Sequence, residues 1–152
     1  MIMEDIQFIK KHIGKNQRLL SLDVSKNNIG LATSDSNLSL AFPLKTIKRT
    51  QFKNDIILLK KIIATEEIFA LVIGFPYDGD GSLNERTQST KDFAKEVLKH
   101  IDIPIFFQDE RFSTNLVKHN NLKKNNKDID EQAAAWFLQI FLDKLNNVLQ
   151  FS

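Results

Sequence analysis

The fold of this chain is decided by residues 19–35, which read LLSLDVSKNNIGLATSD. Apolar residues alternate with smaller or polar ones over residues 20–24, which is typical of a strand. Residues 25–28 supply the polar side chains of a tight turn, and residues 29–33 resume a strand. We therefore predict a β-hairpin with Asp23 near the end of its first strand. A carboxylate at that place either helps to turn the chain or meets a cation, because an unpaired buried charge is costly.

Composition indicates one compact globular domain. The chain has 152 residues, of which 42% are hydrophobic and 26% charged. Its net charge of +2 permits a nucleic-acid partner without requiring one. The absence of cysteine excludes disulfides, thiolate metal sites and cysteine nucleophiles. No apolar run approaches the roughly 20 residues of a membrane span, and the N-terminus lacks the pattern of a secretory signal. We expect a cytoplasmic protein that does not contact a membrane.

The rest of the chain contains two patterns of secondary structure. Apolar spacing predicts an accessory N-terminal helix over residues 1–17, and the main domain then spans residues 18–152. Further predicted strands are residues 38–47 (with Pro43 marking an edge or a bulge), 69–73 and 104–107. The first two predicted helices are residues 55–65 and a helix that is opened by a capping box of Ser82 and Glu85 and runs to about residue 100. A short helix is predicted over residues 114–119. The last helix is predicted over residues 129–149, with Asp128 as its N-cap.

This order predicts the fold class. Three consecutive strands with short turns form an antiparallel meander, and two strands that alternate with helices add parallel strands. We therefore expect an α/β domain with a mixed five-stranded sheet and helices on both faces.

Two further acids have positions like that of Asp23. Glu110 follows a buried strand at its carboxyl end, where open α/β sheets bind ligands, although residues 109–111 also suit a solvated loop with an internal ion pair. Asp130 shares the apolar stripe of the last helix with Phe137 and points away from the polar face. An acid in the first turn is also favoured by the helix dipole, by roughly 0.3–1 kcal/mol.

Convergence of the three acids would require cations. Two unit charges about 4 Å apart repel by about 4 kcal/mol at an effective dielectric constant near 20. Oxygen ligands without cysteine suit Mg²⁺ or Mn²⁺. Clusters of this kind hold two ions about 3.5–4 Å apart and support phosphodiester cleavage.

Four stretches of the chain resemble motifs of the YqgF/RuvX family. They are DVSKNNIGLATSD at 23–35, VIGFP at 72–76 with DGS at 80–82, DERFST at 109–114, and DEQAA at 130–134 with LQ at 138–139. The motifs follow one another in the family's order, and the likeness covers about residues 18–143.

The resemblance implies a ribonuclease H-like fold and a bacterial nuclease. The family is described both as a Holliday junction resolvase and as the nuclease that matures the 5′ end of 16S ribosomal RNA. Its acidic residues match Asp23, Glu110 and Asp130 here, so these are the expected catalytic and metal-binding residues. Two positions depart from the family pattern, which usually has Gly at Ser25 and Arg at Asn28. The second departure removes a potential phosphate contact, and the first can alter the hairpin turn.

Basic residues near the acids are candidates for holding a nucleic-acid backbone. Each is also an ordinary type of surface residue, since most charge runs are solvated faces. The candidates are Arg86, Arg111, Lys123, Lys124 and Lys127.

The sequence thus predicts a phosphodiester hydrolase that uses two Mg²⁺ or Mn²⁺ ions and acts on structured nucleic acid. Precursor 16S rRNA is the first choice of substrate and a branched DNA junction the second, because a chain with so modest a charge and no evident dimerisation seam suits a monomer or a weak homodimer. An actin-like ATPase needs a second similar domain, for which this chain is too short. A non-catalytic nucleic-acid-binding module is the remaining alternative, and in it the acids would be dispensable.

Overall fold

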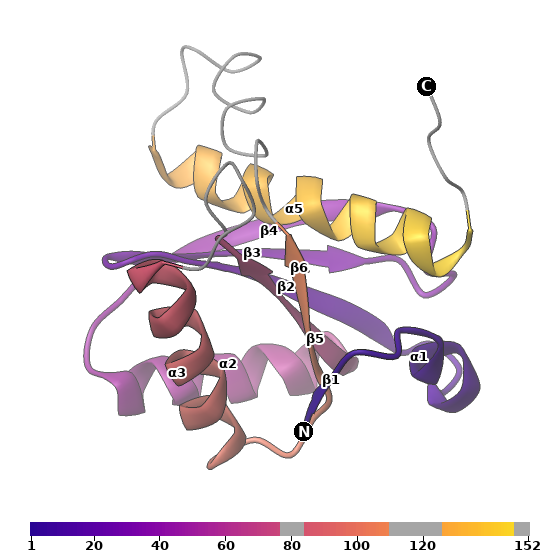
Figure 1. Cartoon of the computed structure of the whole chain (residues 1–152), viewed down its shortest axis with the longest axis horizontal. Helices are drawn as coiled ribbons and strands as arrows, with labels where there is room; N and C mark the ends of the chain where they lie inside the picture. The colour runs from indigo at the N-terminus through magenta and orange to yellow at the C-terminus, as the bar shows by residue number, and fades with distance from the viewer. Residues whose placement is uncertain (77–83, 110–125, 148–152) are drawn as a thin grey trace.

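A six-stranded mixed sheet forms the middle layer of the structure, a computed structural model that describes residues 1–76, 84–109 and 126–147 (Figure 1). The strands are β1 (Ile2–Met3), β2 (Arg18–Val24), β3 (Asn28–Ser34), β4 (Ala41–Lys48), β5 (Ile68–Phe75) and β6 (Ile105–Asp109). The helices are α1 (Gln7–His12), α2 (Phe52–Thr65), α3 (Glu85–Leu98) and α5 (Asn126–Leu145). The predicted helix over residues 114–119 lies outside the described residues.

The strand order is β1-β6-β5-β2-β3-β4. Strands β2, β3 and β4 form the predicted antiparallel meander, and β5 and β6 join it in parallel with β2. The predicted mixed α/β sheet is therefore confirmed. The predicted count of five strands is wrong within the described residues, because β1 pairs with β6 and adds a sixth.

The N-terminal segment differs from the predicted continuous helix over residues 1–17. Residues 2–3 extend along β6, with Ile2 opposite Ile105. Only Gln7–His12 is helical, and Ile9 is fully buried in the same apolar cluster as part of α5. Pairing with a distant strand overrides the local helical spacing of these isoleucines, as tertiary contacts commonly do.

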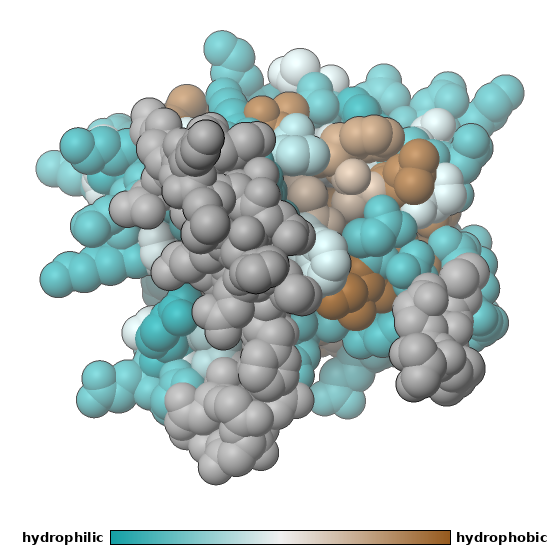
Figure 2. All heavy atoms as spheres, turned by 90° about the horizontal axis from the view of Figure 1, so that it is seen from above, coloured by the Kyte–Doolittle hydropathy of each residue, from teal (hydrophilic) through white to brown (hydrophobic). Residues whose placement is uncertain are grey.

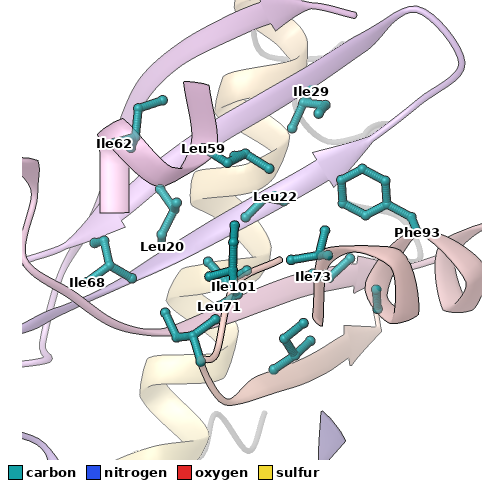
Figure 3. Packing of buried hydrophobic residues seen from close by; sticks show 14 of the residues in the cluster. Leu20, Leu22, Ile29, Leu59, Ile62, Ile68, Leu71, Ile73, Phe93 and Ile101 are labelled. Carbon is teal, nitrogen blue, oxygen red and sulfur yellow. The ribbon is translucent and has the colours of Figure 1, made fainter. Parts of the chain in front are cut away.

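Two apolar clusters fill the space on the two faces of the sheet. The first, here called the α2/α3 cluster, contains Leu20, Leu22, Ile29, Leu31, Leu71 and Ile73 of the sheet together with Leu59 and Phe93 of the helices (Figure 3). The second, here called the α5 cluster, contains Leu19, Ala32, Ala70, Val72 and Phe106 of the sheet together with Phe137 and Phe141. Successive side chains of a strand point to opposite faces of the sheet. A residue next to a member of one cluster therefore faces the side that holds the other cluster.

Helix α5 covers the second face of the sheet and presents a mixed surface to solvent. Ala134, Phe137 and Phe141 are fully buried, as their shared stripe predicts, whereas Trp136 on the outer side is 41% exposed. Figure 2 looks onto this layer and shows hydrophobic side chains beside hydrophilic ones. Of the helices in the described ranges, none is long and apolar enough to cross a membrane.

Two predicted helix caps differ from the structure. The capping box of α3 is formed by Asn84 and Thr87 instead of Ser82 and Glu85, and Glu85 is the first residue of the helix. The Asn84 side chain also donates to the Pro76 carbonyl at 2.9 Å, which ties the start of α3 to the end of β5. Helix α5 begins at Asn126, so Asp128 is within the helix and is not its N-cap.

Strand β4 begins later than predicted but has the predicted irregularity. The Asp35 carboxylate accepts from the Ser39 and Leu40 amides at 2.7 and 3.0 Å, so the turn after β3 extends to residue 40. The register of β4 shifts between the pairs Leu31–Lys45 and Ala32–Pro43. Pro43 thus occupies an edge strand at a bulge, where a residue without an N–H is tolerated.

The main chain of α5 at Asp130 and Glu131 lies on a glycine of the sheet. A Cβ atom built on Gly30 would lie 2.8 Å from the Glu131 nitrogen and closer still to the carbonyl carbon and oxygen of Asp130. These are backbone atoms, which cannot rotate away as a side chain can. Only glycine at position 30 lets the helix approach the sheet this closely.

We predict that Gly30→Ala lowers the melting temperature by several degrees. Overpacking a tight contact costs about 1–3 kcal/mol, and for a chain of this length each kcal/mol corresponds to roughly 2–4 °C. Gly14→Ala is the matched control, since its Cβ would meet only the Gln17 side chain, at 2.9 Å, which can move. Equal melting temperatures for the two variants in a thermal denaturation experiment would contradict the packing constraint.

Candidate active site

Asp23 lies on the α5 face of the sheet, one residue before the end of β2. The preceding residue with the same orientation, Ser21, donates from its hydroxyl to the Ala134 carbonyl of α5 at 2.9 Å. Asp23 is only 8% exposed. The predicted place of this acid, at the carboxyl end of the first hairpin strand, is thus confirmed, and its side chain is directed toward the layer that contains α5.

The residues beside Asp23 leave space around its carboxylate. In the sheet register Asp23 lies opposite Gly30 of β3. On the other side, Leu22 pairs with Ile73, so the next residue of β5 beside Asp23 is Gly74. Gly74 in turn pairs with Gln108 of β6. Because neither flanking glycine has a side chain, no side chain from the two adjacent strands crowds the carboxylate from the side.

Asp130 reaches the same point from the far end of the sequence. Its main chain lies against Gly30, the register partner of Asp23. Its side chain is partly exposed at the carboxyl edge of the sheet. The structure therefore places the main chain of Asp130 beside the strand residue that lies opposite Asp23.

The other predicted site residues have different positions or are not described. Glu110, Arg111, Lys123 and Lys124 lie outside the described residues. Lys127 belongs to the first turn of α5, but its side chain is also outside the description. Within residues 1–76, 84–109 and 126–147, no group of three or more acidic, histidine or cysteine side chains forms a metal-binding set.

The described donors nevertheless fit a hard divalent cation. Asp23 and Asp130 supply carboxylate oxygens, which Mg²⁺ and Mn²⁺ prefer. Gln108 is 4% exposed, and its side-chain oxygen has no hydrogen-bond partner in the described part of the chain. It is in the same row of the sheet as Asp23, with Gly74 between them. A buried amide oxygen without a partner is a group that a hydrated ion would satisfy.

Sequence reasoning missed Gly30 and Gln108. The prediction placed Gln108 in the segment that ends its strand, whereas β6 continues through Asp109 and buries it. A buried polar residue within an apolar strand was the available signal. The importance of Gly30 had no local signal, because its contact is with α5.

The hairpin turn accommodates Ser25. The Ser25 hydroxyl accepts from the Asn28 amide at 3.1 Å and donates to the Asn28 carbonyl at 3.0 Å. Arg49 donates from Nη1 to the Ser25 carbonyl at 2.8 Å. The departure from glycine at this position therefore adds a hydrogen-bonded closure to the turn that follows Asp23.

Charges near the carboxyl end of β6 are of both signs. Partial burial lowers the pKa of Lys144, and the Asp109 carboxylate opposes that shift.

Arg86 is exposed in the first turn of α3, on the α2/α3 side of the sheet. Arg86 therefore lines a different face from the one that bears Asp23.

Solved structures with a similar fold are resolvases. The chain superposes on Thermus thermophilus RuvC in complex with a Holliday junction substrate with a TM-score of 0.52 at 11% identity, covering 84% of this chain and 94% of that one. It superposes on the fowlpox virus resolvase in complex with Holliday junction DNA with a TM-score of 0.52 at 10% identity, covering 85% and 99%. At such identities the similarity establishes the fold, which is the predicted ribonuclease H-like one.

Sequence comparison identifies the family. Proteins named "Putative pre-16S rRNA nuclease" match at 39% identity from Roseobacter denitrificans, over 95% of this chain and 94% of the relative, and at 40% from Pelagibacter ubique, over 90% and 94%. The relative from Rickettsia rickettsii is 35% identical, over 97% of this chain and 100% of its own length. The family model described as "RuvX: Holliday junction resolvase" matches residues 17–144. The chain belongs to the RuvX family, as its four motifs predicted.

Proposed function

We propose that this protein is a metal-dependent nuclease that hydrolyses phosphodiester bonds in structured nucleic acid. The observation on which the proposal rests is the packing of Asp130 on Gly30, the register partner of Asp23. The main chain of one acid thereby lies beside the register partner of the other, and we propose that their carboxylates meet at the carboxyl edge of the sheet, where open α/β sheets bind their ligands.

The proposed roles follow from the donor set. Asp23, Glu110 and Asp130 would hold two Mg²⁺ or Mn²⁺ ions, with Asp23 shared between them. Ions bound in this way activate water and stabilise the leaving oxygen in phosphodiester cleavage. Asp23 is held in place by strand pairing on both sides and by the Ser25–Asn28 turn. Gln108 supplies a neutral oxygen beside the acids.

Binding of the nucleic-acid backbone is assigned to basic residues around this edge. Arg86 and Arg111 contact phosphates, and Lys123, Lys124 and Lys127 extend the cationic surface. The backbone contacts position the substrate and do not read its sequence.

Precursor 16S rRNA is the proposed substrate, and the protein is proposed to mature its 5′ end in the cytoplasm. The names of the relatives and the modest net charge of +2 support this choice. A branched DNA junction is the second candidate, supported by the description of the family model and by the resolvases that share the fold. A resolvase cuts a two-fold symmetric junction as a dimer, and we propose a monomer or at most a weak homodimer here.

The first test compares cleavage of a 16S precursor fragment and a four-way DNA junction, with Mg²⁺ and with Mn²⁺. We expect RNA cleavage near the mature 5′ end and at least a tenfold loss in Asp23→Asn, because each 1.36 kcal/mol of lost transition-state stabilisation lowers the rate tenfold. Asp102→Asn is the control, since Asp102 is exposed before the amino end of β6. Preferential cutting of the junction would favour the resolvase, and failure to cut either substrate would favour a binding module.

The second test asks whether the acids form one metal site. Saturation by a ligand at a hundredfold excess over Kd stabilises the native state by about 2.7 kcal/mol, so Mn²⁺ should raise the melting temperature by several degrees. Asp130→Asn should raise the metal-free melting temperature by removing repulsion, and should shrink the Mn²⁺-induced rise. If Asp130 interacts only with the helix dipole, the reverse is expected. Asp130→Asn would then have a lower metal-free melting temperature than the parent chain, and its response to Mn²⁺ would be unchanged.

The third test concerns the lysines before and at the start of α5. Replacing Lys123, Lys124 and Lys127 together by alanine should weaken nucleic-acid binding. Each lost phosphate contact should reduce the log–log salt slope by roughly 0.7–0.9. The matched control replaces the exposed Lys10, Lys11 and Lys15, which changes the net charge equally. Identical salt slopes in the two triple variants would assign the predicted lysines to a solvated surface.

A further inference from the structure

The end of the β2–β3 hairpin extends past the strand that supports β2 on its other side. The last register pair between β2 and β5 is Leu22–Ile73, one residue before Asp23. Pairing of β2 with β3 continues to Val24–Ile29. How firmly the chain is held after Asp23 therefore depends on β3 and on the groups that bind the turn.

Arg49 binds this turn at two points. It follows β4, whose last register pair with β3 is Asn28–Lys48. The main-chain N–H of Arg49 donates to the Asn27 carbonyl at 2.8 Å. Its Nη1 donates to the Ser25 carbonyl, also at 2.8 Å. Figure 1 shows the connection from β4 to α2 leaving the sheet beside the hairpin tip, so the Arg49 side chain ties the turn to this connection.

Two helices hold the Arg49 guanidinium in place. The Asp55 carboxylate of α2 is only 2% exposed, and its Oδ2 lies 3.8 Å from Arg49 Nε. That oxygen has no hydrogen-bond partner in the described part of the chain, so Arg49 supplies the counter-charge that a buried carboxylate needs. On α3, the centroid of the Phe93 ring lies 5.4 Å from the guanidinium carbon. Arg49 therefore connects the turn to both helices that cover this face of the sheet.

We propose that Arg49 is a positioning residue for the candidate metal site. Through the Ser25 carbonyl it fixes the turn after β2, and with it the direction of the Asp23 carboxylate two residues earlier. The inference rests on the proposed role of Asp23 as a metal ligand. A group that orients a metal ligand contributes to affinity without touching the ion, and its loss typically lowers metal affinity 10–100-fold.

The test removes the Arg49 side chain without leaving a buried charge alone. Arg49→Met by itself would leave the Asp55 carboxylate without a counter-charge, so it is combined with Asp55→Asn. The matched control combines Arg18→Met with Glu66→Gln at the opposite end of β2. Arg18 also donates to a main-chain carbonyl, that of Glu66 at 3.1 Å, and pairs with the Glu66 carboxylate at 3.3 Å. Both joint variants leave the net charge of the chain unchanged.

Hydrogen exchange of the full chain in EDTA tests the turn without metal. The Ser25 N–H donates to the Asn28 carbonyl at 2.9 Å. Its exchange, followed by NMR, should be about tenfold faster or more in the Arg49 joint variant, which is the loss expected for a hydrogen bond from a charged group. The Arg18 joint variant should show the parent rate at this amide.

Titration with Mn²⁺, followed by the electron paramagnetic resonance signal of the free ion, tests the metal site. The Kd for Mn²⁺ should rise about tenfold or more in the Arg49 joint variant and stay unchanged in the control. Binding of an RNA oligonucleotide in EDTA, measured by fluorescence anisotropy, should be unchanged in both variants, because Arg49 acts through Asp23 and not on the strand.

The inference is overturned if either the exchange of Ser25 or the Kd for Mn²⁺ is the same in the two joint variants while circular dichroism shows both folded. It is also overturned if the Arg49 joint variant loses only RNA binding, which would assign Arg49 to a direct phosphate contact. Failure of the proposed metal-dependent nuclease would instead appear as a parent chain that binds no Mn²⁺, and the exchange of Ser25 alone would then decide whether Arg49 fixes the turn.

Discussion

Helix α5 lies with its main chain at Asp130 directly on Gly30, a residue that has no side chain to hold the helix away. This contact determines how close the helix comes to the sheet at its carboxyl edge. It also determines where Asp130 is relative to Asp23, since Gly30 is the register partner of Asp23. Any side chain at position 30 would displace backbone atoms and, with them, the acid of the helix.

The apolar clusters on the two faces make that geometry rigid. The α5 cluster anchors the helix through Phe137 and Phe141, both fully buried. The α2/α3 cluster supports the opposite face, so the strands that present Asp23 are packed from both sides. A close-packed interior resists displacement of either layer. The packing of both faces therefore fixes the main chain of α5 relative to β2 and β3.

The two faces of the hairpin present different chemistry at one edge of the sheet. Asp23 is directed to the α5 side, while Val24 and the turn residues after it border a cavity on the α2/α3 side that is lined by charges of both signs. Arg49 connects the two features, because it bonds to the Ser25 carbonyl of the turn and also lines the cavity. Although Asn28 replaces the arginine that is usual in the family, the guanidinium of Arg49, the residue after β4, thus lies at the same turn.

Local patterns in the sequence were enough to predict the hairpin, the meander, the buried strand of residues 69–73 and the inward face of α5. Alternation and helical spacing are properties of neighbouring residues, and they survive because each element must bury one face. The position of Asp23 at a strand end and the membership of the RuvX family follow from the same stretches. The cap of α3 was misplaced by two residues, because Asn84 and Thr87 form a capping box without the Glu or Gln that the sequence pattern requires.

Features that depend on contacts between distant segments were decided by the tertiary structure alone. Strand β1 exists because Ile2 finds a partner in β6, although its spacing resembles a helix. The burial of Gln108 and the cavity beside Lys26 and Arg86 arise where separate elements meet. The sequence by itself determined which acids are available and where each begins or ends an element. Only the packing of α5 on Gly30 placed the main chain of Asp130 beside the register partner of Asp23, because close approach of two backbones leaves no pattern in either segment.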